Sequence, residues 1–182
     1  AAALLGLETE PRVAIVSENG FDGACLDLGC LLHGILVSPL SPHLTVGELA
    51  AAFDALGVNL AVVSSEESLR RLREASRRVA RPFRVVLLDA AAELAGEGDV
   101  VLGELLAARD DAALSAALAR APRRALGETC TVLFTSGSTG GQKGVAFSME
   151  NLVTKRFARA AALPFVGDEE VLLCFLPLYH TF

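Results

Sequence analysis

Residues 12–37 read RVAIVSENGFDGACLDLGCLLHGILV, and the fold class can be inferred from this segment. The apolar run at residues 12–17 is typical of a short buried strand, and residues 21–33 have the length of a helix. Phe21, Leu28, Leu31 and Leu32 lie on or near one face of that helix. Gly34 is a helix stop, and residues 35–37 form the next apolar run. The segment therefore predicts a strand–helix–strand unit.

The same alternation continues downstream, with a helix at 46–56, a strand at 60–63, a helix at 66–80 and a strand at 83–88. Thr45 and Glu48 predict a capping box at the start of the first of these helices, and Gly57 ends it. Ser64 and Glu67 predict a second capping box. Crossovers of this length imply right-handed βαβ units, and near-continuous apolar strands imply burial on both faces. We expect an α/β fold with a mainly parallel sheet flanked by helices on both faces.

The composition excludes several classes of protein. The chain has 182 residues, of which 52% are hydrophobic, so a packed core is expected. The formal net charge of −6 argues against a nucleic-acid partner. No run of 18 apolar residues predicts a transmembrane helix. The four cysteines lie in apolar runs without metal-ligand spacing, which indicates buried reduced thiols and a cytoplasmic location.

Two stretches of the chain give less information about structure and function. The helix around residues 69–79 carries five arginines, which form either a solvated face or a surface for anions or membranes. Residues 90–125 predict one or two surface helices. The chain lacks an initial Met, and residues 173–182 end inside an apolar run, so we expect a piece of a longer protein.

Chemistry is concentrated in residues 130–145, CTVLFTSGSTGGQKGV. A strand is followed by hydroxyl side chains, glycines and Lys143 within a few residues. Glycines let backbone amides turn toward one point, and hydroxyls add donors without bulk. A lysine supplies a mobile positive charge, which suits a polyphosphate. A flexible glycine-rich hairpin without a ligand is the plainer alternative, but it does not require this set of side chains.

The known phosphate-loop patterns do not match this segment. The Walker pattern fails because Gln142 precedes Lys143 and Gly144 follows it, and the dinucleotide fingerprint fails on glycine spacing. Both of those motifs continue into a helix, whereas residues 145–147 predict a strand. A strand–loop–strand arrangement must hold phosphate with hydroxyls, amides and lysine, without a helix dipole.

Residues 135–144, TSGSTGGQKG, resemble the phosphate-loop signature of the adenylate-forming superfamily, which includes acyl-CoA synthetases, luciferases and peptide-synthetase adenylation domains. Gln142 departs from the proline common at this position, which leaves the loop more mobile without removing a donor. Residues 176–182, LPLYHTF, resemble the family's next motif, and residues 17–39 are similar to its strand–helix–strand. The resemblance implies that the chain is part of the large N-terminal domain, with the remainder and the C-terminal domain absent.

The resemblance also implies a reaction and roles for individual residues. Such enzymes join a carboxylate to ATP and then pass the acyl group to a thiol such as coenzyme A. The residues expected at the β- and γ-phosphates are Thr135, Ser136, Gly137, Ser138, Thr139 and Gly140. Lys143 is expected to neutralise the leaving group, Thr135 to contact Mg²⁺ as well, and His180 to be the catalytic residue beside the acyl-adenylate.

The resemblance leaves the substrate and some alternatives open. The LPLYH segment favours a fatty acid over an amino or aryl acid. Because the later motifs of the family would lie beyond Phe182, we expect the chain alone to be inactive and to expose apolar surface, with possible self-association. One rival is a non-catalytic ATP-binding module. Another is an unrelated phosphotransferase, which predicts a helix directly after Gly144.

Overall fold

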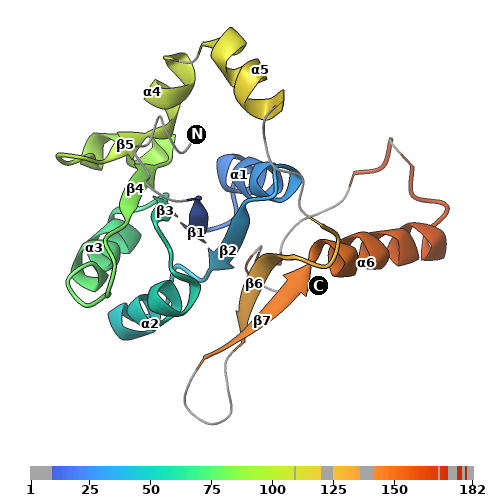
Figure 1. The fold of residues 1–182 in the computed structure, drawn as a ribbon, viewed down its shortest axis with the longest axis horizontal. Helices are drawn as coiled ribbons and strands as arrows, with labels where there is room; N and C mark the ends of the chain where they lie inside the picture. The colour runs from blue at the N-terminus through green and yellow to red at the C-terminus, as the bar shows by residue number, and fades with distance from the viewer. Residues whose placement is uncertain are drawn as a thin grey trace.

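A computed structural model describes residues 10–108, 110–119, 125–135, 142–167, 169–171, 176–177 and 179. Seven strands form one sheet in the order β5-β4-β3-β1-β2-β6-β7 (Figure 1). The strands are β1 (Arg12–Val16), β2 (Leu36–Leu40), β3 (Leu60–Val63), β4 (Arg84–Leu87), β5 (Val100–Val101), β6 (Thr129–Thr135) and β7 (Lys143–Ser148). All neighbours are parallel except β6 and β7, which are antiparallel. The predicted α/β fold with a mainly parallel sheet is confirmed.

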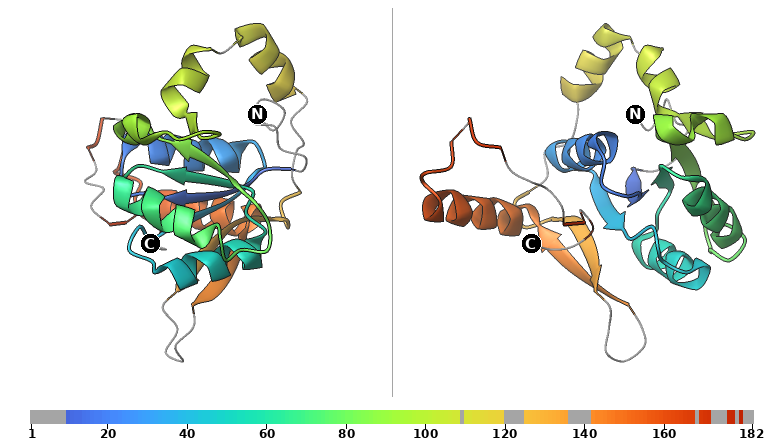
Figure 2. Two further views of the ribbon diagram at one scale, coloured as in Figure 1. Left: turned by 90° about the vertical axis from the view of Figure 1, so that its left-hand side faces the viewer. Right: turned by 180° about the vertical axis from the view of Figure 1, so that it is seen from behind.

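Helices cover both faces of this sheet (Figure 2). The helices are α1 (Phe21–Leu32), α2 (Val46–Leu56), α3 (Glu66–Ala75), the 3₁₀ helix η1 (Asp89–Leu94), α4 (Leu102–Ala107), α5 (Asp111–Ala119) and α6 (Met149–Ala162). Alternate residues of β1 point to opposite faces, as expected for a strand. Ala14 and Val16 belong to the larger core, which contains residues of α2 and α3, whereas Val13 and Ile15 pack with residues of α1 and α4. The sheet is therefore buried on both sides.

Helix α2 matches its prediction at both ends. Thr45 and Glu48 form the capping box, with Glu48 N donating to Thr45 Oγ1 at 3.3 Å and Thr45 N donating to Glu48 Oε2 at 2.9 Å. The Glu48 carboxyl also accepts from Thr45 Oγ1 at 2.7 Å, and its hydrogen bonds with the Thr45 backbone and, second, the Thr45 side chain lower its pKa. Gly57 ends the helix in the left-handed region at φ 63°.

The second predicted capping box is wrong. The N-cap of α3 is Ser65, whose hydroxyl accepts from Ser68 N at 3.3 Å, so the position three residues on holds a serine rather than a glutamate. The helix also ends at Ala75 instead of residue 80. Ser76 Oγ donates to Arg73 O at 2.8 Å and so bonds to a carbonyl of the last turn, as serines do near helix ends.

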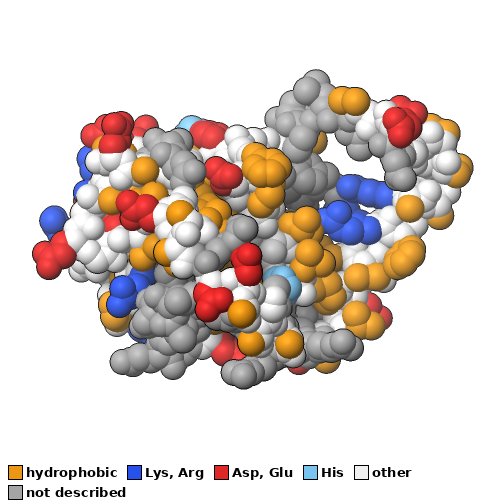
Figure 3. Space-filling model, turned by 90° about the horizontal axis from the view of Figure 1, so that it is seen from above, with side chains coloured by type: hydrophobic (Ala, Val, Ile, Leu, Met, Phe, Trp, Pro, Cys, Tyr) orange, Lys and Arg blue, Asp and Glu red, His pale blue; other side chains and the backbone are white. Residues whose placement is uncertain are grey.

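The apolar face predicted for α1 is only partly buried. Leu31 packs against the core, whereas Phe21, Leu28 and Leu32 are 82%, 51% and 71% exposed. Figure 3 shows hydrophobic side chains gathered on the face that is seen from above. Self-association through such exposed apolar side chains stays a prediction.

Other strands and helices begin or end a few residues from their predicted boundaries. Strand β2 covers Leu36–Leu40 and so extends beyond the predicted 35–37, and β4 is shorter than predicted. Two short helices, α4 and α5, occur within residues 90–125, as predicted. Sequence reasoning missed β5 because two residues are too short for a periodic pattern. Among the described residues, no helix has both the length and the apolarity needed to span a membrane.

Candidate functional site

Strands β6 and β7 form the stem of the predicted phosphate loop. Thr135 pairs with Lys143 at the end of the ladder, and Thr135 Oγ1 donates to Lys143 O at 3.4 Å. Strand β6 passes from buried residues around Val132 to exposed Thr135, so the open end of the stem faces solvent. The chain continues as a strand after the loop, and helix α6 begins only at Met149. The strand–loop–strand arrangement is confirmed, and the helix that the phosphotransferase alternative required after Gly144 is absent.

Gly144 is fixed by packing within this stem. A Cβ added there would lie 3.0 Å from Val132 Cγ1 and 3.4 Å from Phe134 Cε1. Both side chains belong to the opposite strand, and Gly144 is the register partner of Phe134. A side chain at residue 144 would therefore require the Val132 and Phe134 side chains to shift next to Lys143.

Strand β6 is anchored to the centre of the sheet through Ser38. Pro39 lies in β2 between β1 and β6 and has no amide hydrogen for the ladder. The register of β2 and β6 pairs Val37 with Thr131, and the buried Ser38 hydroxyl donates to Val132 O at 2.5 Å. This side-chain hydrogen bond supplements the backbone pairing beside the proline and holds the strand that carries the loop.

Ser38→Ala is expected to lower the free energy of unfolding by about 1 kcal/mol, because the buried Val132 carbonyl loses its side-chain donor. Urea unfolding measures the change. Ser76→Ala removes an exposed hydroxyl that also donates to a carbonyl, and it should change stability by less than about 0.5 kcal/mol. Equal changes in the free energy of unfolding in the two variants would show that the hydrogen bond from Ser38 does not stabilise β6.

The loop itself is only partly described. Ser136, Gly137, Ser138, Thr139 and Gly140 lie outside the described residues, so their predicted contacts stay predictions. Lys143 is exposed, and its Nζ makes no hydrogen bond or ion pair with a residue that the structure describes. The Oε1 atom of Gln142 is buried without a hydrogen-bond partner there. The described base of the loop thus offers a cation to solvent and one unused acceptor.

Two described residues of the second motif, Leu176 and Tyr179, lie near the carboxyl ends of β1 and β2. Asn19, which follows β1, donates from Nδ2 to Leu176 O at 2.8 Å. Tyr179 lines a small cavity together with Ser17 and Pro39. Carboxyl ends of parallel strands are the usual place for ligands in such sheets. His180, the predicted catalytic residue, lies outside the described residues, although its neighbour Tyr179 is at this edge.

Asp27, which sequence reasoning missed, is a half-buried carboxylate that lines the same cavity. Burial raises its pKa from 3.8 to about 6, and the positive charge of Arg156 opposes this shift. Its Oδ1 atom has no hydrogen-bond partner in the described part of the chain. The available signal was an aspartate between two leucines inside an apolar helix segment, residues 24–32.

The cysteines differ in exposure. Cys30 and Cys130 are buried, as predicted, and burial with the nearby Asp27 charge raises the pKa of the Cys30 thiol to about 12. Cys25 is exposed, so the prediction of a buried thiol is wrong there, because it lies on the outward side of α1. No group of three or more potential metal ligands of the His, Cys, Asp or Glu type occurs among residues with described positions.

Comparison with known proteins identifies the family. The family of AMP-binding enzymes matches residues 1–182. The chain belongs to this family. The long-chain-fatty-acid–CoA ligase FadD15 of Mycobacterium bovis is 31% identical over 183 residues, a match that covers 97% of this chain and 29% of that protein. This AMP-binding chain therefore spans less than a third of the length of that relative.

Solved structures share the fold of this AMP-binding chain. ATP-bound MatB from Rhodopseudomonas palustris aligns with a TM-score of 0.73 and 22% identity, over 98% of this chain and 32% of that one. A red-emitting luciferase from Phrixothrix hirtus aligns with a TM-score of 0.75 and 21% identity, over 98% of this chain and 34% of that one. The alignments agree with the resemblance inferred from the two motifs.

The described residues fit a nucleotide better than a protein-held metal. Exposed Lys143 at the mouth of the stem offers one cation to a phosphate tail, and the Thr135 hydroxyl, which donates to Lys143 O at 3.4 Å, lies beside it. Thr135 can give Mg²⁺ only one neutral oxygen, and no acidic cluster stands beside it in the described region. An Mg²⁺ ion at this mouth would therefore take most of its ligands from phosphate oxygens and water, as is usual for this ion.

Proposed function

We propose that the chain provides the ATP phosphate-binding part of an enzyme that activates a carboxylic acid as an acyl-adenylate and then transfers the acyl group to a thiol such as coenzyme A. In this proposal residues 1–182 are part of the large N-terminal domain, and a C-terminal domain completes the enzyme in the cytoplasm. The observation that carries it is the exposed strand–loop–strand stem, with Thr135 and Lys143 paired at its open end.

The reaction sets an electrostatic problem that these residues fit. A carboxylate oxygen forms a bond to the α-phosphorus of ATP, the bond to the pyrophosphate oxygen breaks, and the pyrophosphate leaves with added negative charge. Lys143 would neutralise that charge, and Thr135 with the loop amides and hydroxyls would hold the β- and γ-phosphates. Bound Mg²⁺ would lower the repulsion between the phosphates and the incoming carboxylate. His180 would border the acyl-adenylate.

A long-chain fatty acid is the proposed substrate. It is supported by the similarity to FadD15, which is a long-chain-fatty-acid–CoA ligase, and by the LPLYH segment, of which Leu176 and Tyr179 lie at the carboxyl edge of the sheet. An amino or aryl acid is the alternative within the same chemistry. The other alternative is a non-catalytic module, in which the loop binds ATP but no acyl-adenylate is formed.

Pyrophosphate exchange tests the proposal in two proteins. The 182-residue chain alone is expected to show no pyrophosphate exchange above background with palmitate and ATP. The reason is that the adenine-binding residues of this family belong to later sequence motifs. A hybrid in which this chain replaces the matching segment of the M. bovis ligase should exchange. Robust turnover by the chain alone would contradict the fragment proposal, and an inactive but folded hybrid would favour the non-catalytic module.

A further inference from the structure

Positive charge is concentrated in residues 66–84. This segment contains seven arginines and three glutamates, a net charge of +4, whereas the whole chain has −6, which leaves −10 for all other residues. Such an asymmetry produces a local positive potential on an otherwise acidic protein. The segment comprises α3 and the turns that lead to β4.

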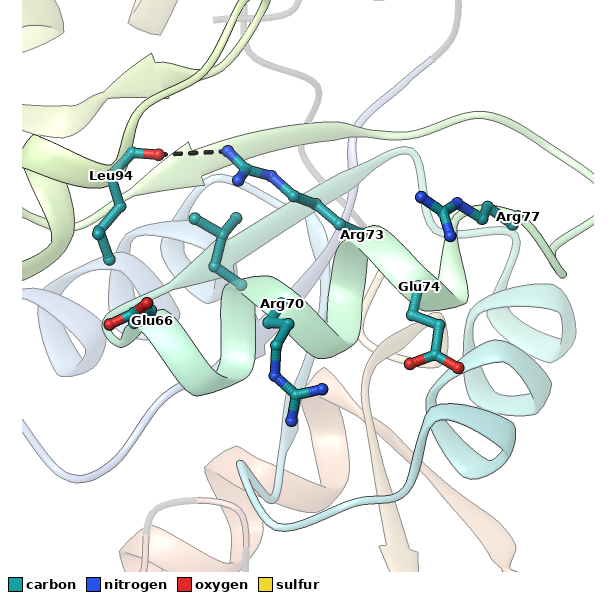
Figure 4. Close-up of a pocket in the computed structure, with 7 residues that line it drawn as sticks. Glu66, Arg70, Arg73, Glu74, Arg77 and Leu94 are labelled. Atoms are coloured by element: carbon teal, nitrogen blue, oxygen red, sulfur yellow. Dashed lines mark hydrogen bonds between the residues drawn. The ribbon is translucent and has the colours of Figure 1, made fainter.

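A groove lies along this segment (Figure 4). It has a volume of about 420 Å³ and is lined by Arg70 and Arg73 of α3, by Arg77 in the following turn, and by Leu94 at the end of η1. Leu69, which is 2% exposed, forms part of its floor. Glu66 and Glu74 also line the groove, and the Glu74 carboxylate is paired with Arg78 at 2.9 Å. The groove thus combines an apolar floor with three arginine and two glutamate side chains.

Arg73 builds one wall of the groove. Its Nη2 atom donates to Leu94 O at 3.2 Å and to Asp99 Oδ2 at 3.0 Å. The same Asp99 oxygen accepts from Gly96 N at 2.9 Å, and Gly96 packs so closely that a Cβ there would lie 2.9 Å from Arg73 Nη2. These contacts hold residues 94–99 against α3, so this wall is fixed before any ligand arrives.

Arg70 and Arg77 are available to a ligand. Both side chains are exposed, and neither guanidinium group makes a hydrogen bond or ion pair with any described residue. By contrast, Arg71 and Arg78 form ion pairs at 3.0 and 2.9 Å with glutamates one helical turn earlier. Of the three arginines that line the groove, Arg73 is therefore held by an ion pair, whereas the guanidinium groups of Arg70 and Arg77 have no partner among the described residues.

The arrangement of the arginines indicates an extended ligand. Arg70, Arg73 and Arg77 point in different directions in Figure 4 instead of converging on one point, as a single phosphate would require. At a helical rise of 1.5 Å per residue, Arg70 and Arg77 start about 10 Å apart along the axis. Carboxylates on alternate residues of an extended peptide repeat at about 7 Å, which lets two or more of them reach these cations.

Other macromolecules fit this surface less well. No described residue of the 66–84 segment is a large exposed hydrophobic side chain, whereas helices that lie on membranes insert such anchors. The charge of −10 on the remaining residues opposes binding along a nucleic acid. A short acidic peptide segment contacts the groove alone and avoids that repulsion.

We propose that the groove along α3 binds an acidic segment of a partner protein in extended conformation, with its carboxylates on Arg70 and Arg77. Arg73 and the 94–99 segment form the fixed wall. Glu66 marks one end of the groove in the first turn of α3, where the positive end of the helix dipole offsets its charge. The ligand's acidic residues therefore lie toward Arg77 rather than over Glu66.

Fluorescence anisotropy with a labelled EAEAEAE peptide tests this proposal on the full chain at low salt. The double variant Arg70→Gln/Arg77→Gln is expected to weaken binding at least about five-fold, since two exposed charge contacts are lost. The matched control Arg81→Gln/Arg84→Gln removes the same charge from exposed positions outside the groove, and it should change binding less than about two-fold. Circular dichroism verifies that both variants fold.

Several results would overturn the proposal. Equal weakening in both double variants would mean that only net charge matters, and a QAQAQAQ peptide that binds equally well would exclude recognition of carboxylates. Absence of peptide binding would exclude the site. Tripolyphosphate that binds more tightly than the peptide, with the same dependence on Arg70 and Arg77, would assign the groove to a small phosphate ligand. Phosphatidylserine vesicles that bind through these arginines without peptide binding would assign it to a membrane.

Discussion

Lys143→Met in the hybrid ligase is expected to lower the rate of acyl-adenylate formation about 100-fold, which corresponds to about 2.7 kcal/mol of transition-state stabilisation. Lys143 is the first residue of β7, and its backbone is fixed by pairing with Thr135. The strand therefore holds the base of the lysine while its Nζ stays free in the described structure. Methionine keeps the length and apolar stem of the side chain and removes only the charge.

The effect of Lys143→Met should appear mainly in kcat. A charge that meets the leaving pyrophosphate stabilises the transition state more than bound ATP, so KM for ATP should rise far less than kcat falls. Lys155→Met, in exposed α6, is the matched control for the loss of one positive charge, and it should change kcat less than about two-fold. If Lys143→Met exchanges pyrophosphate at the control rate, the phosphate loop does not act through this lysine.

Local signals in the sequence were enough to predict most of the sheet. Strands β1, β3 and β4 are mostly apolar runs near a glycine, proline or capping residue, so their positions follow from nearby residues, whereas β2 continues past its apolar run through Ser38 and Pro39. Helix α2 was predicted to the residue because Thr45 and Gly57 mark both of its ends. For helix α3 the predicted start at residue 66 was right, but the capping serine is Ser65 rather than its neighbour Ser64, and the helix ends at Ala75 rather than at residue 80.

The candidate site was predictable in its loop but not in its surroundings. The loop was predictable from the side chains and glycines of residues 135–144 themselves, and the strand after Lys143 was predictable from the apolar residues 145–147. The anchor from Ser38 to Val132 joins residues that are 94 positions apart, which no local pattern reveals. The burial of Asp27 likewise depends on residues from both ends of the chain, including Ser17 and Tyr179.

Asp27→Asn is expected to raise the free energy of unfolding by about 2 kcal/mol at pH 7.5 and to leave it almost unchanged near pH 3.5. The pKa of Asp27 is about 6 in the folded chain against 3.8 without burial, so the folded state holds its proton more tightly. Between these two values the unfolded state ionises first, and stability falls as the pH rises. Above pH 6 the carboxyl is ionised in both states. The loss of unfolding free energy that the burial of this charge causes is then constant, with an upper limit of about 3 kcal/mol.

Asparagine removes this cost, because it is neutral at every pH and has nearly the same shape. Urea unfolding of both proteins from pH 3.5 to 7.5 should show a difference that grows between pH 4 and 6 and then levels off. Asp22→Asn makes the same change in the first turn of α1, where a negative charge is favourable, so it should lower stability slightly. A stability gain for Asp27→Asn that is independent of pH would show that lost repulsion or packing, rather than the ionisation of this carboxyl, causes it.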